Sequence, residues 1–178
     1  MIVLITGGAR SGKSTFAESV YQGKSGVVYI ATSRVEDDEM RERVNRHRLS
    51  RPNYWRTCEC TYNLEDAVGP EKYYLLDCIT VLVSNIMFDM SKDITAIDKE
   101  LQNSIEDKAV QVIRKLVDKV RNLNMDLVMV TNEVGCSIVP ENQIARVYRD
   151  IAGRVNQRIA GMSDEVYAVF CGIPLKLK

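Results

Sequence analysis

The stretch GGARSGKS at residues 7–14 matches the phosphate-binding pattern G-x-x-x-x-G-K-[ST] in full. Its glycines let the backbone curl, so that successive N–H groups point toward one bound anion. Lys13 would reach the β- and γ-phosphates of a nucleotide, and the hydroxyl group of Ser14 would ligate Mg²⁺. The alternative is a glycine-rich turn that only opens a helix. Because an apolar run precedes the motif and a helical pattern follows it, the sequence favours a nucleoside triphosphate site.

A carboxylate suited to the metal ion follows the apolar run 73–76. Asp77 would stand at the carboxyl end of a strand, and open α/β sheets bind their ligands at this edge. In P-loop proteins a strand near the phosphate loop supplies an acid to Mg²⁺ at the same edge. The pattern also allows Asp77 to cap a helix that starts at Ile79. The guanine-binding pattern N-K-x-D of regulatory GTPases has no match, since residues 131–134 read TNEV. This weakens a GTPase switch but leaves GTP open as a substrate.

Residues 41–56 read RERVNRHRLSRPNYWR and place the single histidine, His47, among six arginines. In a helix over residues 36–50, Met40, Val44 and His47 would share one face. Spacing alone favours a partly buried structural histidine on a charged helix. The alternative is that the arginines bind phosphate groups and keep the imidazole neutral. A neutral ring nitrogen could then attack phosphorus and carry a nucleotide covalently.

Short, continuous apolar runs alternate with helical patterns along the chain, which is typical of strands covered on both faces in a parallel sheet. The expected strands are Ile2–Thr6, Val27–Thr32, Tyr73–Ile79, Leu127–Thr131, Glu165–Cys171 and Leu175–Leu177. The expected helices lie near residues 13–22, 36–50, 80–89, 94–123 and 141–160, the last with Pro140 at its first position. The alternation predicts a doubly wound α/β fold.

Length and composition indicate one soluble globular domain over residues 1–178. The apolar fraction is 46%, and 24 basic residues balance 24 acidic ones. No global electric field would therefore attract nucleic acid or an acidic membrane, and any anion site must be local. The apolar start of the chain, at residues 1–6, is too short for a signal peptide or a membrane span.

The five cysteines are scattered, and the pair Cys58 and Cys60 lacks the two-residue gap of a zinc or redox motif. With one histidine in the chain, a four-ligand zinc site is not expected. This cysteine usage indicates a reducing, cytoplasmic environment.

Six stretches, in order, match one family: ITGGARSGKS (5–14), YIATS (29–33), DDEMRERVNRHRLSRPNYWRTCE (37–59), LLDCIT (75–80), VTNEVGCSIVPEN (130–142) and ARVYRDIAGRVNQRIA (145–160). On these residues the chain resembles the bifunctional adenosylcobinamide kinase/adenosylcobinamide-phosphate guanylyltransferase family of cobalamin biosynthesis. With the phosphate loop, the resemblance predicts an α/β fold of the P-loop NTPase (RecA-like) class. Its central sheet would be mostly parallel and flanked by helices.

The resemblance implies two reactions at one site. The first phosphorylates the aminopropanol hydroxyl of adenosylcobinamide with ATP or GTP. The second transfers GMP from GTP to that phosphate through a covalent GMP–histidine, which gives adenosylcobinamide-GDP and pyrophosphate. The matching position of the histidine is His47.

The resemblance also implies site residues. The nucleotide-binding positions are Gly7, Gly8, Ala9, Arg10, Ser11, Gly12, Lys13, Ser14, Thr32, Ser33, Arg34, Arg48, Leu49, Ser50, Arg51, Glu59 and Asp77, with Lys13 catalytic and with Ser14 and Asp77 on Mg²⁺. It further implies a homo-oligomer, a trimer in this family, a corrinoid substrate, and no nucleic-acid partner. The loop residues Asn132, Glu133 and Glu141 either touch substrate or metal, or only cap the helix that follows Pro140.

Three other interpretations remain. The chain could keep the guanylyltransferase activity alone, or it could be a P-loop kinase of another small metabolite that forms no covalent nucleotide. It could also be a binding module in which the nucleotide only switches conformation. The corrinoid products formed with GTP would distinguish them.

Overall fold

The computed structural model describes residues 1–34, 42, 52–92 and 96–178, which build a seven-stranded sheet in the order β3-β2-β4-β5-β1-β6-β7. Every strand pairing is parallel except that of β6 with β7. The strands are β1 (Ile2–Gly7), β2 (Val27–Ala31), β3 (Arg56–Glu59), β4 (Tyr73–Asp77), β5 (Asp126–Val130), β6 (Glu165–Phe170) and β7 (Ile173–Lys176).

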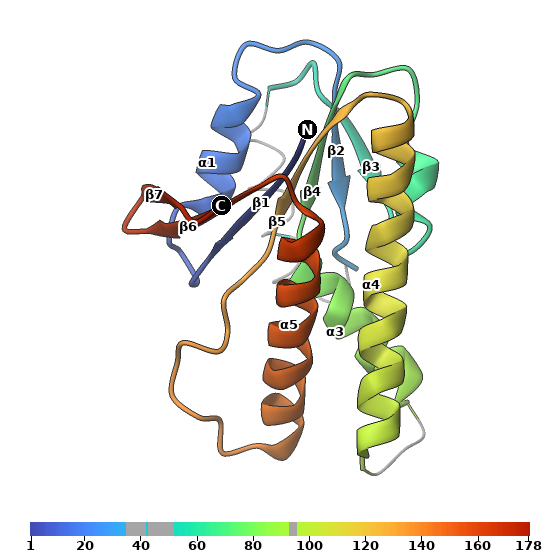
Figure 1. The fold of residues 1–178 in the computed structure, drawn as a ribbon, viewed down its shortest axis with the longest axis vertical. Coiled ribbons are helices and arrows are strands. Elements are labelled where there is room, and N and C mark those ends of the chain that lie inside the picture. The colour runs from blue at the N-terminus through green and yellow to red at the C-terminus, as the bar shows by residue number, and fades with distance from the viewer. Residues whose placement is uncertain (35–41, 43–51, 93–95) are drawn as a thin grey trace.

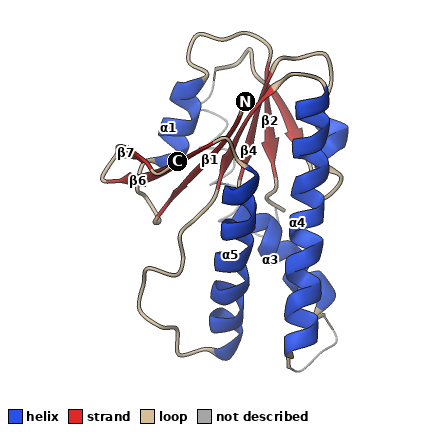
Figure 2. Cartoon of the chain, viewed as in Figure 1, coloured by secondary structure: helices blue, strands red, loops and turns tan. Residues whose placement is uncertain are grey.

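Helices cover both faces of the sheet (Figures 1 and 2). They are α1 (Lys13–Val20), α3 (Ile79–Met90), α4 (Lys99–Asn122) and α5 (Gln143–Met162), with a short 3₁₀ helix at Leu64–Ala67. The helix α1 packs on one face, and α3, α4 and α5 pack together on the other. The described helices include none that unites the length and the hydrophobicity required to cross a membrane.

Alternate side chains of each strand point to opposite faces, so the sheet carries two apolar cores. In β1, Ile2 and Leu4 join the core under α3, α4 and α5, whereas Val3 and Ile5 join the core under α1. Burial on both faces explains why the central strands read as continuous apolar runs rather than as alternating patterns. This rigid centre holds the strand ends that carry the site.

The predicted fold class is confirmed: a mostly parallel sheet flanked by helices, with the phosphate-loop motif between β1 and α1. The predicted strand Tyr73–Ile79 ends earlier, at Asp77, because Ile79 already opens α3. The last helix begins at Gln143 rather than at 141, so Pro140 is not its first residue. Its N-cap is Asn142, whose side chain accepts hydrogen bonds from two backbone N–H groups.

Three further elements need comment: β3 and α4 differ from the sequence prediction, and the third is not tested. The edge strand β3 was missed, because its residues are polar and two of them are exposed. The predicted helix over residues 36–50 lies outside the described residues, apart from Glu42. The predicted helix 94–123 is α4, which begins at Lys99 after the N-cap Asp98.

Candidate active site at the phosphate loop

The register of the sheet brings the predicted acids to the edge where the phosphate loop lies. Ile5 of β1 pairs with Val130 of β5, which in turn pairs with Asp77 of β4. Asp77 and Glu59 both flank Ala31 of β2. The ends of β1, β4 and β3 therefore meet at the carboxyl edge, as expected for ligand binding in an open α/β sheet.

The phosphate loop needs glycine at two positions. A side-chain carbon on Gly7 would lie 2.6 Å from the Oγ of Ser11 and 2.7 Å from the carbonyl oxygen of Val169. Gly12 has a φ of 92°, in the left-handed region that favours glycine, and it immediately precedes α1. The loop therefore turns tightly and directs the N-terminus of α1 to the carboxyl edge of the sheet.

Lys13 and Ser14 begin α1, at the positive end of the helix dipole. The side chain of Lys13 is buried, and its ammonium group donates a 3.1 Å hydrogen bond to the carbonyl oxygen of Gly8, so it folds back over the loop. The Oγ of Ser11 is buried and has no hydrogen-bond partner among the described residues. The loop thus presents a cation and a helix N-terminus, which together suit a phosphate group.

Asp77 is held by a tyrosine that the sequence analysis did not single out. The hydroxyl group of Tyr29, on the neighbouring strand β2, donates a 2.6 Å hydrogen bond to the Oδ2 atom of Asp77. The N-cap of α3 is Cys78, and no side chain makes a capping hydrogen bond there. The capping alternative for Asp77 is therefore excluded, and the carboxylate stays available at the carboxyl edge.

Thr32 and Ser33 follow β2 at the same edge. Thr32 is fully buried, and its hydroxyl group donates to the carbonyl oxygen of Cys78 at 2.8 Å and accepts from the Cys78 N–H at 3.1 Å. The amide of Asn85 also donates to the Thr32 carbonyl oxygen at 2.9 Å. Thr32 therefore ties the end of β2 to the start of α3, while Ser33 is half-buried beside it.

Arg34 forms a charged cluster with α3. Its guanidinium group donates to both carboxylate oxygens of Asp89, at 2.8 and 2.6 Å, and to the hydroxyl of Tyr62 at 3.1 Å. The Tyr62 hydroxyl donates to the same carboxylate at 2.5 Å. These hydrogen bonds, that from Arg34 first, hold the pKa of Asp89 well below its usual range. Arg34 thus lies near the carboxyl edge with its charge directed at Asp89.

A polar network surrounds the end of β5. The side-chain amide of Asn132 donates to the Thr80 hydroxyl at 2.6 Å, and the Tyr148 hydroxyl donates to the Thr80 carbonyl oxygen at 3.0 Å. Asn156 donates to the Asn132 carbonyl oxygen at 3.0 Å and accepts from the Thr131 hydroxyl at 2.7 Å. Burial, more than the nearby Cys78 thiol, raises the pKa of Tyr148 to about 12, so its hydroxyl remains a donor.

This network answers one question that the sequence left open. Asn132 does not cap α5, because Asn142 does so. It instead holds the carboxyl end of β5 against α3. Glu133 accepts a 2.7 Å hydrogen bond from the Gly135 N–H within its own loop. The sequence analysis missed Tyr148 and Asn156 as site residues. Both lie on α5, and the local sequence of a helix does not show which distant residues its side chains contact.

Glu59 ends β3 and is exposed at the edge of the sheet. Cys58 and Cys60, on either side of it, form no disulfide, and their thiols are hydrogen-bonded to each other. Burial is the main cause, and the hydrogen bond with Cys58 the second, of a pKa of Cys60 raised to about 12. Cys60 therefore stays a thiol at neutral pH and is a poor nucleophile. Among the described residues, no three His, Cys, Asp or Glu side chains cluster as metal ligands.

The remaining predicted residues, His47, Arg48, Leu49, Ser50 and Arg51, lie outside the described part of the chain. The described residues therefore bring together the phosphate loop, Asp77, Thr32 and Glu59 at one edge. That the arginine-rich stretch lies at the same edge stays a prediction.

The whole chain is similar to proteins of one metabolic pathway. A family model described as cobinamide kinase / cobinamide phosphate guanyltransferase matches residues 3–177. The bifunctional adenosylcobalamin biosynthesis protein CobU of Escherichia coli K12 is 43% identical over 100% of both chains, and its Salmonella typhimurium counterpart is 44% identical over 100% of both. The bifunctional adenosylcobalamin biosynthesis protein CobP of Pseudomonas aeruginosa is 34% identical, over 98% of this chain and 96% of that protein.

Proposed function

The chain belongs to the cobinamide kinase / cobinamide phosphate guanyltransferase family, and from this we propose that its phosphate loop serves both reactions of that family. The protein is a bifunctional enzyme of adenosylcobalamin biosynthesis, a kinase and a guanylyltransferase. The match over residues 3–177 is the observation that carries this conclusion. The intact loop at residues 7–14 supports the use of a nucleoside triphosphate in both steps.

In the kinase step, the aminopropanol hydroxyl of adenosylcobinamide attacks the γ-phosphorus of ATP or GTP. A bond forms between the hydroxyl oxygen and phosphorus, the bond from phosphorus to the bridging oxygen breaks, and the nucleoside diphosphate leaves while the hydroxyl proton is released. Lys13 and the backbone N–H groups of the loop stabilise the charge on the phosphoryl oxygens. The position of Lys13 at the start of α1 supports this role.

In the guanylyltransferase step, a neutral ring nitrogen of His47 attacks the α-phosphorus of GTP, and pyrophosphate leaves. The phosphate of adenosylcobinamide phosphate then attacks the same phosphorus, the nitrogen–phosphorus bond breaks, and adenosylcobinamide-GDP forms. Arg48 and Arg51, together with the backbone of Leu49 and Ser50, would bind the phosphoryl oxygens. The family resemblance of residues 37–59 supports this assignment.

The residues present fit a magnesium ion. Mg²⁺ at phosphate-binding sites takes one or two protein oxygens and completes its shell with phosphates and water. Asp77 offers a carboxylate at the carboxyl edge, oriented by Tyr29, and Ser14 offers a hydroxyl group at the start of α1. These two residues would hold the ion, which would neutralise phosphate charge when bound.

Further nucleotide contacts are assigned to the end of β2 and to β3. Ser33 and Glu59 lie at the carboxyl edge and are not fully buried, which supports contact with the nucleotide. Thr32 would act through the backbone it fixes, because its hydroxyl group is bound to Cys78. Arg34 would reach a phosphate by exchanging the Asp89 carboxylate for it, since both ligands suit the planar guanidinium group.

The enzyme is further proposed to be a cytoplasmic homo-oligomer, a trimer by family resemblance. Large apolar side chains on the surface support self-association: Ile138 is 92% exposed, Ile173 70% and Phe170 63%. Free cysteines and the use of ATP or GTP support the cytoplasm.

The direct test is incubation of the enzyme with adenosylcobinamide and either ATP or GTP, followed by separation of the corrinoid products. The proposal expects adenosylcobinamide phosphate with either nucleotide and adenosylcobinamide-GDP with GTP. Guanylylation of supplied adenosylcobinamide phosphate, without phosphorylation of adenosylcobinamide, would show that the guanylyltransferase half works alone. No corrinoid product from either substrate would contradict the proposal.

A further inference from the structure

Two hollows adjoin along α3 on the side of the sheet that faces α5. The first has a volume of about 660 Å³ and lies at the carboxyl edge, and the second has a volume of about 320 Å³ and lies between α3, the start of α4 and the start of α5. They share Phe88 and Lys92, so they form one continuous feature, here called the α3–α5 groove. The groove is defined by Asn132, Tyr148, Phe88, Lys92, Ile144 and Val147.

The inner end of the groove adjoins the phosphate loop. Asn132 lines it, and the next residue, Glu133, donates its backbone N–H to the carbonyl oxygen of Gly7 at 3.0 Å. On the other side of the loop, the turn between β6 and β7 is packed against it, since the Gly172 N–H donates to the Ser11 carbonyl oxygen at 2.8 Å. The inner end of the α3–α5 groove therefore lies beside the phosphate loop, on the side opposite that turn.

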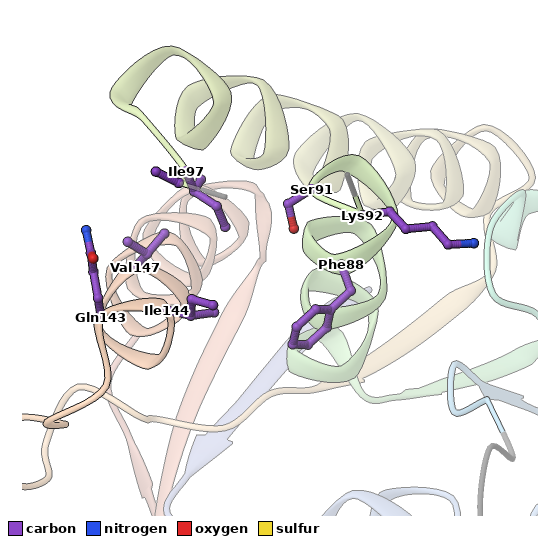
Figure 3. Close-up of a pocket in the computed structure, with 8 residues that line it drawn as sticks. Phe88, Ser91, Lys92, Ile97, Gln143, Ile144 and Val147 are labelled. Carbon is purple, nitrogen blue, oxygen red and sulfur yellow. The ribbon is translucent and has the colours of Figure 1, made fainter. Parts of the chain in front are cut away.

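The chemistry of the groove changes along its length. Its inner end carries amide and hydroxyl groups from Asn132, Tyr148 and Asn85. Its outer end is apolar, and Figure 3 shows Phe88 on α3 and Ile144 on α5 on opposite sides of the hollow. Phe88 is 57% exposed and Ile144 is 49% exposed. Large apolar side chains that line a hollow and are exposed to water indicate a binding site for a ligand with an apolar surface.

Positive charge lies where the two hollows meet. Lys92 is exposed and lines both hollows. The Asp89 carboxylate also lines the first hollow and feels the charge of Lys92, but it is paired with Arg34, so these three charged groups together leave one positive charge. An ammonium group at this place would attract an acceptor that carries a phosphate group after the first reaction. The groove thus offers hydrogen-bonding groups beside the nucleotide, a cation next to them, and an apolar wall beyond.

We propose that the α3–α5 groove binds the corrinoid acceptor of both reactions. The aminopropanol arm, or its phosphate, lies at the inner end beside Asn132, and an apolar face of the corrinoid ring lies against Phe88 and Ile144. An acceptor with a small reactive arm and a large, partly apolar body matches this order of polar and apolar walls. The inference rests on the proposed function, because it takes the acceptor from that function and assigns it a place.

The test compares steady-state kinetics of the wild-type enzyme with those of Phe88→Ser, Ile144→Ser, the double variant and Lys92→Gln. The two apolar side chains are half-exposed and Lys92 is exposed, so the variants should fold, which thermal unfolding would verify. We expect the KM for adenosylcobinamide to rise about tenfold in the double variant, whereas the KM for GTP stays within about twofold. Lys92→Gln should raise the KM for adenosylcobinamide phosphate more than that for adenosylcobinamide.

Matched controls are Leu123→Ser, which removes a 50% exposed apolar side chain beyond the end of α4, and Lys108→Gln on the exposed face of α4. Both should leave the acceptor KM unchanged. An unchanged acceptor KM in the double variant would overturn the inference. An equal rise in the KM for GTP would assign the groove to the nucleotide and would also overturn it. If the wild-type enzyme forms no corrinoid product, the proposed function itself is refuted. The corrinoid acceptor is then also refuted as the ligand of the α3–α5 groove.

Discussion

The hydroxyl group of Tyr29 lies 2.6 Å from the Oδ2 atom of Asp77 and donates a hydrogen bond to it. Tyr29 is buried and stands on β2, beside the strand that Asp77 ends. The bond fixes the orientation of the one carboxylate that the phosphate-loop site offers on β4. When a side chain binds a metal ion, the group that orients it by a hydrogen bond commonly affects the affinity for the metal as well.

Tyr29→Phe should therefore weaken the binding of Mg²⁺ without removing activity. The variant keeps the ring in the core and removes only the hydroxyl group, so we expect a loss of about 1–2 kcal/mol in the free energy of unfolding. The Mg²⁺ concentration for half-maximal activity should rise about tenfold. Titration of activity with Mg²⁺ measures the effect. Tyr167→Phe is the matched control, since its hydroxyl donates to Glu165 at 2.8 Å on β6, three strands away from β4 and Asp77. Equal Mg²⁺ requirements in both variants would refute the role of Tyr29.

Lys13→Met should slow both reactions strongly, because we propose that its ammonium group binds the phosphates in each. We expect a fall of at least about 100-fold in kcat/KM for phosphorylation and for guanylylation, the usual cost of losing a charged group at a developing negative charge. Product formation from each corrinoid substrate measures the two rates separately. Lys99→Met, at an exposed position at the start of α4, serves as the control. Loss of one reaction alone would show that the two steps use different phosphate sites.

The cluster of Arg34, Asp89 and Tyr62 should make stability depend on pH in acid. Hydrogen bonds from Arg34 and Tyr62 hold the pKa of Asp89 below its unfolded value of about 4. The folded state thus binds the proton more weakly than the unfolded state. The resulting stability is fully present above pH of about 4 and is lost as the pH falls through the folded pKa.

Asp89→Asn should accordingly melt at a lower temperature than the wild type at pH 7, and the difference should shrink below pH of about 4. Thermal unfolding followed by circular dichroism across this range would measure it. Asp118→Asn, an exposed residue of α4 with no ion pair among the described residues, should show no such dependence. A difference between Asp89→Asn and wild type that stays constant with pH would contradict the ion pair.

Asn142 should stabilise the helix that carries Tyr148. Its Oδ1 atom accepts hydrogen bonds from the N–H groups of Ile144 and Ala145 at 2.8 and 3.2 Å. Asn142→Ala should lower the free energy of unfolding by about 1 kcal/mol. Asn103→Ala is the control, because an exposed asparagine inside α4 gains helix propensity when replaced by alanine. Urea unfolding of the two variants would measure the contrast, and equal stabilities would contradict the cap.

Local patterns in the sequence predicted the centre of the site. The glycine spacing of residues 7–14 and the acid after four apolar residues are properties of contiguous segments, so the amino-acid sequence alone places the phosphate loop and Asp77. The parallel sheet is predictable from the apolar runs for the same reason. The edge strand β3 is not, because Arg56–Glu59 has one neighbouring strand and a polar, half-exposed pattern.

Contacts between side chains that are far apart in the sequence could not be predicted from it. Arg34 and Asp89 are 55 residues apart, and Asn132 and Thr80 are 52 apart, so their contacts depend on how α3 packs beside β2 and β5. The start of α5 was misplaced for a different reason. Both Pro140 and Asn142 are residues that commonly start a helix. The helix starts after Asn142 because its side chain accepts hydrogen bonds from the first N–H groups, whereas the fixed φ of Pro140 does not set the boundary.

Covalent labelling tests the central claim most directly. The enzyme would be incubated with GTP radiolabelled at the α-phosphate, without acceptor, and its His47→Ala variant would be treated alike. We predict label on the wild-type protein that is lost in acid, is stable in base and passes to adenosylcobinamide phosphate when that acceptor is added. The variant should carry no label while its thermal unfolding stays that of the wild type. Label that persists in His47→Ala would contradict the account.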